Sequence, residues 1–322
     1  MIITLYLEFN LMKLDNINKL KIGTRSSALA MAQTDLVIEK LENTFPSISK
    51  IIEVKKIEVS GDKYKNRHLR NIGGKGLFTK EIDQALIENK IDIAIHSMKD
   101  VDSSLPPGLI IGGVIEREDP REFLLTNITE DLNSLKKNAL IGTSSLRRKA
   151  QLLRNNPELN FVDLRGNILS RIEKLNASEF DATVLASAGL KRLGLNPKGF
   201  VIELDRMLPC LGQGIIGIHV SEKNYKIRNL ISYINDKKTF DELTSERALL
   251  SSLGATCNTP ICGLAEIQND LLFLRSEVYS LDGKECFTTK IKGNISEADL
   301  IGFEAGKELI DLTPSRITES WK

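Results

Sequence analysis

The chain has few of the residues that build cross-links and metal sites. Its 322 residues include four cysteines and three histidines, and no two cysteines form a C-x-x-C pair. Four cysteines do not make a disulfide framework in a chain of this length, and the spacing typical of zinc fingers is absent. We therefore expect no metal site and no disulfide network, as in a protein of a reducing compartment.

The chain also lacks an excess of charge of either sign. It has 44 basic and 43 acidic side chains, which leaves a formal net charge of +1. No global field draws such a chain to nucleic acid or to a membrane surface. The stretch MIITLYLEFNLMK has no basic segment before its apolar run and is far too short to span a bilayer. The sequence thus predicts a cytoplasmic protein with neither a nucleic-acid nor a membrane partner.

What the chain does contain is an alternation of strand and helix patterns. Strand-like runs occur at residues 20–23, 51–59, 91–95, 139–142, 160–164, 182–186 and 214–220. Most of them lead into helical periodicity; in one such helix Leu146, Ala150 and Leu153 are expected to share a face. This order predicts an α/β fold built from two α/β domains.

The character of the sequence changes after about residue 240. A helix leads into a meander with turns at Asn269-Asp270 and Asp282-Gly283. A final helix is expected to start near Ser296, where Ser-x-x-Asp resembles a capping box. We therefore expect a smaller α+β domain at the C-terminal end.

Arginine, serine and threonine recur directly after predicted strands, in GTRSSALA, GTSSLRRKAQ and DLRGNILSR. In an open α/β sheet, ligands bind at the carboxyl ends of strands, where helix N-termini attract anions. Guanidinium groups bind carboxylates in a bidentate way. A site for a ligand with several carboxylates or phosphates is therefore predicted at Arg25, Arg147, Arg148, Arg165 and Arg171. Solvated arginines at helix starts are the simpler alternative for any single position, although arginine in a first helical turn opposes the helix dipole.

Lys99 and Asp100 follow the predicted strand IDIAI. An aspartate in an arginine-rich site can stay ionised, stabilise a developing cation and relay protons. A Lys-Asp pair that caps a loop is the simpler interpretation of these two residues taken alone. His96 has no marked partner base or nucleophile, so a structural role is expected for it.

The stretch NIGGKGLFTKE is glycine-rich without being a phosphate-binding loop. That motif needs glycine at position 69, which is Leu69, and serine or threonine at position 76, which is Gly76. A mobile lid that carries Lys75 and Phe78 is the better interpretation. The hydrolase elbow G-x-S-x-G and the metalloprotease motif H-E-x-x-H are absent from the sequence.

Cys257 and Cys262 lie five residues apart in SSLGATCNTPICGLAE. Free cysteine is usually a small buried hydrophobe, and this is the expectation for Cys210 and Cys286. Cys257 differs because it lies in a turn that could present a thiol. A thiolate near a cluster of arginines has a lowered pKa and is a competent nucleophile.

Eight longer motifs occur in order along the chain: IGTRSSALAMAQ, GGKGLFTKEID, DIAIHSMKDV, EREDPRE, IGTSSLRRKAQLL, LRGNILSRIEKL, LASAGLKRLG and LGQGIIGI. In these motifs the chain resembles the porphobilinogen deaminase (hydroxymethylbilane synthase) family over nearly its whole length from about residue 20. The resemblance implies a monomer with three domains: 19–115 plus 214–234, 119–209, and 237–322. The first two would be similar to type II periplasmic binding proteins, and the third would carry the cofactor.

The resemblance also implies the chemistry. The family joins four porphobilinogens head to tail with release of ammonia, and the product grows on a dipyrromethane cofactor held by a thioether to one cysteine. Cys257 matches the attachment position, and Cys262 would be an extra, structural thiol. Asp100 matches the catalytic aspartate, which would stabilise the cationic azafulvene formed when ammonia leaves.

Each pyrrole unit carries an acetate and a propionate, which would explain the many cationic residues. By motif match, the residues expected to bind cofactor and substrate are Arg25, Ser27, Lys75, Lys99, Thr143, Ser144, Ser145, Arg147, Arg148, Arg165, Gly166, Asn167, Arg171, Arg192 and Gln213. Phe78 is expected on the lid. The chain departs from the family pattern at Asn71, Asp102 and Ala255-Thr256, and none of these changes removes a residue that the mechanism needs.

Two other classes of protein fit less well. A non-catalytic polycarboxylate-binding protein on the same two-domain fold would need an export signal and would have no use for the C-terminal domain or for Cys257. The effector domain of a regulator would come with a helix-turn-helix segment, which the sequence does not show.

Overall fold

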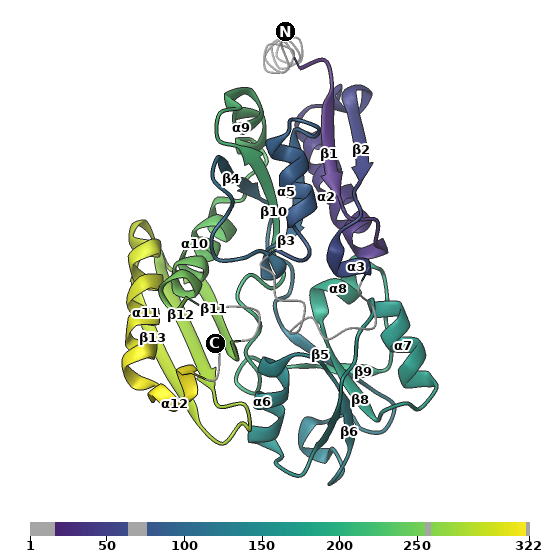
Figure 1. Cartoon of the computed structure of the whole chain (residues 1–322), viewed down its shortest axis with the longest axis vertical. Coiled ribbons are helices and arrows are strands. Elements are labelled where there is room, and N and C mark those ends of the chain that lie inside the picture. Colours follow the sequence, from purple (N-terminus) through teal and green to yellow (C-terminus); the bar gives the residue numbers. More distant parts are fainter. Residues whose placement is uncertain (1–16, 64–75, 255–258, 320–322) are drawn as a thin grey trace. The chain divides into compact units, whose positions relative to one another are not determined.

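The computed structural model describes residues 17–63, 76–254 and 259–319, and these divide into two compact units (Figure 1). The first unit consists of the described residues up to Glu116 together with Ile215–Phe240. The second unit consists of Arg117–Gly214 together with the described residues from Asp241 onward. The chain therefore leaves the first unit after Glu116 and returns to it at Ile215.

The first unit is built on a five-stranded mixed sheet. Its strands, in spatial order, are β2 (Ile52–Lys56), β1 (Leu20–Thr24), β3 (Ile93–Ser97), β10 (Ile216–Ser221) and β4 (Leu109–Val114). β1 runs parallel to β2 and β3, whereas β10 is antiparallel to both of its neighbours. The returning segment thus supplies a central strand, which explains why β10 is apolar along almost its whole length.

Helices on this sheet bury apolar side chains against it. They are α2 (Ala28–Thr44), η1 (Ile48–Ile51), α3 (Ser60–Lys63), α5 (Lys80–Ile87), η2 (Met98–Asp100) and α9 (Tyr225–Ser232). Val37 and Leu41 of α2 pack with Leu20 and Ile22 of β1, and all four are fully buried. The spacing of four residues places Val37 and Leu41 on one face of the helix.

The second unit contains a sheet of the same plan. Its strands, in spatial order, are β7 (Asn160–Val162), β6 (Leu140–Gly142), β8 (Ala182–Ala186), β5 (Glu122–Thr126) and β9 (Gly199–Ile202). β6 is parallel to β7 and β8, and β5 is antiparallel to β8 and β9. The helical elements here are η3 (Leu132–Ser134), α6 (Leu146–Asn155), α7 (Ile168–Asn176) and α8 (Ser187–Arg192).

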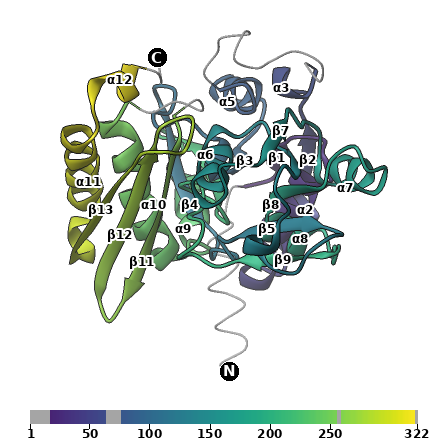
Figure 2. The same ribbon diagram turned by 90° about the horizontal axis from the view of Figure 1, so that it is seen from below.

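The C-terminal part of the second unit is an antiparallel three-stranded sheet with helices packed on it (Figure 2). Its elements are α10 (Lys237–Ser252, from Asp241 onward in this unit), β11 (Ile261–Gln268), β12 (Leu271–Tyr279), β13 (Cys286–Asn294), η4 (Ile295–Glu297), α11 (Ala298–Leu312) and α12 (Ser315–Thr318). Asn269 and Asp270 join β11 to β12 with φ of 49° and 60°, the left-handed conformation that a tight hairpin turn needs.

The expected α/β class, with two sheet-containing parts and a smaller C-terminal part, is confirmed. Strands β4, β5 and β9 were not predicted. The capping-box prediction at Ser296 is wrong, because Asn294 accepts the hydrogen bond from the Ser296 backbone N–H at 3.0 Å and α11 has no side-chain cap. The boundaries of the three expected domains stay a prediction.

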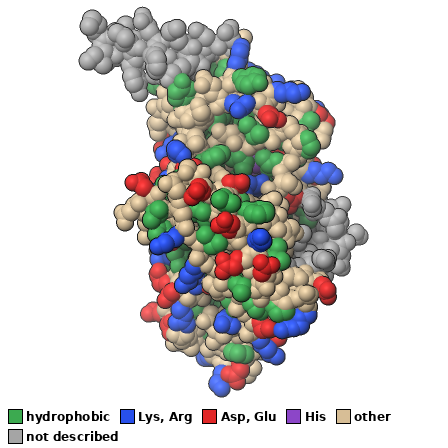
Figure 3. All heavy atoms as spheres, turned by 90° about the vertical axis from the view of Figure 1, so that its left-hand side faces the viewer, with side chains coloured by type: hydrophobic (Ala, Val, Ile, Leu, Met, Phe, Trp, Pro, Cys, Tyr) green, Lys and Arg blue, Asp and Glu red, His purple; other side chains and the backbone are tan. Residues whose placement is uncertain are grey.

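On the face shown in Figure 3, hydrophobic side chains of the described residues lie among acidic and basic ones. Among the helices that the structure describes, none has the length and apolar character that crossing a membrane requires.

Candidate functional site

In the first unit, Arg25 and Ser27 occupy the turn from β1 into α2. The Arg25 guanidinium lies over the Phe78 ring, with its central carbon 4.6 Å from the ring centroid. Ser27 is the N-cap of α2, and its hydroxyl oxygen accepts a hydrogen bond from the Ala30 N–H at 3.3 Å. This turn therefore joins a cationic side chain, an aromatic ring and a helix N-terminus, a combination suited to anions.

Lys99 and Asp100 lie in η2, immediately after β3, and both are half-buried. Because β1 and β3 are parallel neighbours, their carboxyl ends meet at the same edge of the sheet. The Gln33 side-chain amide of α2 donates a hydrogen bond to Ser97 Oγ at 2.8 Å, which ties α2 to the end of β3. The structure thus brings the β1 turn and η2 to one edge, as the strand pattern predicted.

Two of the predicted site residues, Lys75 and Cys257, lie outside the described residues. They belong to the expected lid and to the expected cofactor attachment. Phe78, the other residue expected on the lid, is described and is half-buried just before α5.

In the second unit, three successive hydroxyl residues form the turn from β6 into α6. Thr143 Oγ1 accepts from the Ser145 N–H at 3.2 Å, and Ser145 Oγ caps α6 by accepting from the Arg148 N–H at 3.4 Å. Ser144 Oγ donates to the Leu164 carbonyl oxygen at 2.8 Å, in the loop that follows β7. These bonds hold the two predicted ligand-binding turns of this unit beside each other.

Arg147 and Arg148 are buried, with exposed fractions of only 8% and 7%. Both contact Glu122 of β5: Arg147 Nη1 lies 2.7 Å from Oε1, and Arg148 donates from Nε and Nη2 at 3.1 and 2.7 Å. Burial alone would raise the pKa of Glu122, but Arg148 and Arg147 outweigh it and lower the pKa to about 2. Two guanidinium groups therefore share one carboxylate, which leaves one buried positive charge in excess.

This burial corrects the sequence prediction for α6. The face expected to pack was Leu146, Ala150 and Leu153, but Leu146 and Leu153 are only half-buried. The buried set is Arg147, Arg148, Ala150, Gln151 and Leu152. The reason is Glu122, whose fully buried carboxylate makes a polar helix face the favourable one to bury.

The turn after β7 holds Arg165, Gly166 and Asn167. Gly166 has φ of +115°, a conformation that an L side chain avoids, and a Cβ there would collide with Ser170 Oγ. Asn167 caps α7 by accepting from the Ser170 N–H at 2.8 Å, and Arg171 Nε donates to the Gly166 carbonyl at 2.9 Å. Arg165 Nε lies 3.4 Å from Asp163 Oδ2.

Arg192 and Gln213 each carry a buried polar atom without a hydrogen-bond partner among the described residues: Arg192 Nε and Gln213 Oε1. Arg192 Nη2 donates to the Gly214 carbonyl at 2.6 Å, and Gln213 Nε2 donates to the Pro120 carbonyl at 2.7 Å. Burial lowers the pKa of Arg192 to about 10, against the opposing effect of Glu118. A ligand carboxylate beside Arg192 would offset this loss of solvation.

Sequence reasoning missed the acidic partners in this unit. Besides Glu122, Glu246 of α10 is fully buried and lies 2.7 Å from Arg117 Nη1. The two Glu246 oxygens also accept from the Ala265 and Gly212 backbone N–H groups. Glu122 belongs to the motif EREDPRE, but nothing in that run of charges marks which residue is buried.

The described cysteines are free. Cys262 is fully buried beside Leu208, Leu264 and Tyr279, as expected for a packed thiol, and burial raises its pKa well above the ordinary value. Cys210 and Cys286 are half-buried, so the expectation that they are buried hydrophobes is only partly met.

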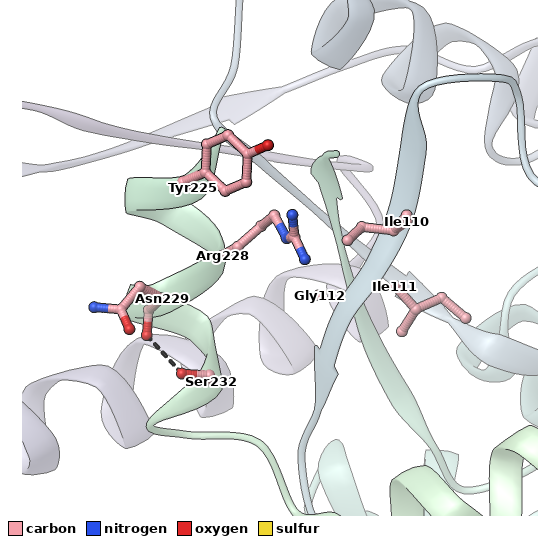
Figure 4. A pocket seen from close by; sticks show the side chains of 7 residues that line it. All are labelled: Ile110, Ile111, Gly112, Tyr225, Arg228, Asn229 and Ser232. Carbon is pink, nitrogen blue, oxygen red and sulfur yellow. Dashed lines mark hydrogen bonds between the residues drawn. The ribbon is translucent and has the colours of Figure 1, made fainter. Parts of the chain in front are cut away.

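A separate surface pocket of about 390 Å³ lies between α9 and β4 in the first unit (Figure 4). The Arg228 guanidinium lies over the Tyr225 ring at 5.4 Å from its centroid, and Ser232 Oγ donates to the Asn229 carbonyl. The pocket contains none of the predicted site residues, so it has no part in the site described above.

Fold and site together define an α/β protein whose strand ends present arginine, hydroxyl and helix N-terminal groups suited to a ligand with several carboxylates. Comparison with family models identifies the family of this protein. Residues 20–229 match the family model "Porphobilinogen deaminase, dipyromethane cofactor binding domain", and residues 240–311 match "Porphobilinogen deaminase, C-terminal domain". The chain belongs to the porphobilinogen deaminase family.

Individual relatives agree with this assignment. The chain is 44% identical to a porphobilinogen deaminase from Syntrophomonas wolfei over 90% of its own length and 93% of the relative. It is 42% identical to that of Rickettsia prowazekii (91% and 99% covered) and 41% identical to that of Bacillus subtilis (94% and 99% covered).

Solved structures show a weaker likeness. The Bordetella pertussis BvgS periplasmic VFT2 domain is 12% identical, covers 75% of this chain and 97% of its own, and has a TM-score of 0.42. The family assignment therefore depends on the family models and the sequence relatives.

Proposed function

We propose that this chain catalyses the stepwise, deaminative, head-to-tail condensation of four porphobilinogens to hydroxymethylbilane. Family membership makes it a transferase of tetrapyrrole biosynthesis that acts on porphobilinogen and uses a dipyrromethane cofactor. The observation that carries the proposal is that the two family models cover both the cofactor-binding part and the C-terminal part of the chain.

The second unit fits a cofactor that carries carboxylates. Arg147 and Arg148 share a single carboxylate, and buried Arg192 Nε has no hydrogen-bond partner among the described residues. A ligand carboxylate supplies the counter-charge and the acceptor that these groups lack. We assign cofactor and substrate carboxylates in this unit to Thr143, Ser144, Ser145, Arg147, Arg148, Arg165, Gly166, Asn167, Arg171, Arg192 and Gln213.

In the first unit, Arg25, Ser27, Lys75 and Lys99 complete the proposed binding set. Asp100 is the proposed catalytic residue. Its carboxylate would accept hydrogen bonds from pyrrole N–H groups and stabilise the positive charge that develops on the substrate as ammonia leaves. It would also hold the proton that is lost when the new carbon–carbon bond forms.

The cofactor supplies the pyrrole carbon to which the first substrate is joined. Cys257 is the proposed attachment residue. It precedes β11 by four residues and follows α10 by five, so this part of the sequence connects two elements of the second unit. Cys262, the alternative thiol, is fully buried on β11, which disfavours it as the anchor.

We also propose that the chain acts as a monomer in the cytoplasm and binds neither nucleic acid nor membrane. The formal net charge of +1 supports the absence of a polyanionic partner. A non-catalytic polycarboxylate-binding protein is not favoured, because the match to the deaminase family includes the C-terminal domain.

Intact-protein mass spectrometry tests the proposal. The purified chain should carry an excess mass of two pyrrole units, and peptide mapping should locate it on Cys257. Cys257→Ser should lose the excess and the activity, whereas the matched variant Cys262→Ser should keep both. Loss of the excess from Cys262→Ser alone would move the attachment site, and unmodified protein with full turnover would refute the covalent cofactor.

A further inference from the structure

Three titratable side chains that the proposed function does not use meet inside the first unit. They are Asp83 of α5, His96 of β3 and His219 of β10, with exposed fractions of 2%, 4% and 0%. β3 and β10 are antiparallel neighbours in which His96 pairs with Gly217, and Ala94 pairs with His219. Alternate residues of a strand share a face, so both imidazoles lie on the same face of the sheet.

The potential ligand atoms of these side chains converge. His219 Nδ1 lies 3.0 Å from Asp83 Oδ1, and His96 Nε2 lies 3.4 Å from the same oxygen. One ligand atom from each residue lies within 4.8 Å of the others. The rings are 4.4 Å apart between centroids and tilted by 45°.

His96 Nε2 distinguishes this cluster from an ordinary hydrogen-bonded core group. It is buried, and although Asp83 is near, it makes no hydrogen bond to any described residue. A buried nitrogen without a partner costs free energy, which either a shared proton in better geometry or a bound cation would recover. The nitrogen lies 3.4 Å from the same oxygen that His219 contacts, so a single ion could bind all three groups.

We propose that Asp83, His96 and His219 form a binding site for a divalent transition-metal ion, with Zn²⁺ as the first candidate. Zinc binds imidazole nitrogen at about 2.0–2.1 Å and carboxylate oxygen at about 2.0–2.2 Å, so neighbouring ligand atoms of a tetrahedral site lie roughly 3.3–3.5 Å apart. The distance of 3.4 Å between His96 Nε2 and Asp83 Oδ1 falls in that range, and the distance of 3.0 Å between His219 Nδ1 and the same oxygen is slightly shorter. Two imidazoles with one carboxylate suit zinc, whereas Mg²⁺ and Ca²⁺ prefer oxygen ligands.

The cluster supplies three ligand atoms, one from each side chain. No fourth His, Cys, Asp or Glu within the described ranges joins the group, so a water molecule or a main-chain oxygen completes the coordination.

The burial of all three ligands makes the site structural. The ion would connect α5 to two central strands of the sheet, and β3 is the strand that leads into η2. No part of the substrate is involved, so the proposal stands independently of the proposed function.

The test uses the purified full-length protein, stripped of metal with a chelator and titrated with Co²⁺. We expect visible absorption from bound Co²⁺ that saturates near one ion per chain and is abolished by Zn²⁺. Protein from zinc-supplemented medium should carry about one zinc per chain by elemental analysis. Asp83→Asn and His219→Gln preserve approximate side-chain size and the capacity to hydrogen-bond, and each should weaken Co²⁺ binding at least tenfold.

Cys286→Ser is the matched control, because it removes a thiol that could bind metal in the second unit and should leave the titration unchanged. Less than about 0.1 Co²⁺ or Zn²⁺ per chain in the wild-type protein would overturn the proposal. Asp83, His96 and His219 would then be a buried group that shares protons. Undiminished binding by both cluster variants would also overturn the proposal. If a variant does not fold, the Co²⁺ titration and the zinc content of the wild-type protein still test the proposal.

Discussion

Asp100 is half-buried at the end of β3, in a short 3₁₀ turn rather than in a strand or long helix. It follows the end of β3, which the hydrogen bond between Gln33 and Ser97 ties to α2. The turn that carries Arg25 follows β1, the parallel neighbour of β3. A carboxylate in this position is fixed by its backbone yet remains accessible to a ligand. This combination suits a group that must face charge developing on a substrate.

Replacing Asp100 should separate binding from catalysis. Asp100→Asn keeps the size of the side chain and removes its charge, so the variant should still carry the two-pyrrole mass while turnover falls by roughly 10²-fold or more. Steady-state kinetics and intact mass on the same preparation provide the measurement. Asp102→Asn, two residues further along the chain, is the control and should stay close to wild type. A variant at Asp100 with near-normal turnover would remove it from the mechanism.

At the scale of the element, the length of a strand did not decide whether the sequence predicted it. β1 and α2 were predicted, and so were the three-residue strands β6 and β7, because each of these strands is followed by a helical pattern. β4 was missed because Gly112 and Gly113 interrupt its apolar run, and β9 was missed because it opens on a glycine and no helix follows it. Missing β5 had a consequence for the site, since Glu122 on that strand decides which face of α6 is buried.

The β7–α7 turn offers a test of how one element is held in place. Gly166→Ala should lower the free energy of unfolding by about 2–3 kcal/mol, because the φ of +115° is unfavourable for alanine and its Cβ would collide with Ser170. Urea unfolding monitored by circular dichroism provides the measurement.

Two further variants isolate the causes. Gly194 has φ of +61°, and no atom lies within 4 Å of a Cβ added there. Gly194→Ala should therefore lower the free energy of unfolding by about 1 kcal/mol. Adding Ser170→Ala to Gly166→Ala should recover part of the loss by removing the hydroxyl from the collision. If Gly166→Ala and Gly194→Ala lower the free energy of unfolding equally, the collision between a Cβ at position 166 and Ser170 does not contribute to the loss.

At the scale of the whole molecule, the topology of each unit, more than proximity in the sequence, brings the proposed binding residues of that unit to one edge of its sheet. In the first unit, β1, β2 and β3 are parallel, and the antiparallel strand β10 pairs with β3. In the second unit, β6, β7 and β8 are parallel, and the antiparallel strand β5 pairs with β8. Motif matching predicted which residues belong to the proposed site. It could not predict Glu122 as a shared partner, nor the meeting of Asp83, His96 and His219, because these contacts join residues far apart in the sequence.

The Glu122 cluster should make stability depend on acid pH. Because Arg148 and Arg147 lower the folded pKa of Glu122 to about 2, against the raising effect of burial, its contribution is present above the ordinary pKa of about 4.5. This contribution, on the order of 3 kcal/mol, should be lost as the pH falls from about 5 towards 2. Glu122→Gln leaves two buried guanidinium groups without a counter-charge and should be less stable at pH 7 by about 3–5 kcal/mol. Urea unfolding of both proteins between pH 7 and pH 3 should show the difference in free energy of unfolding narrowing, because Glu122 in the unfolded wild type binds a proton near pH 4.5 while the folded carboxylate stays ionised. A difference that stays constant over this range would mean that the two arginines do not lower the folded pKa of Glu122.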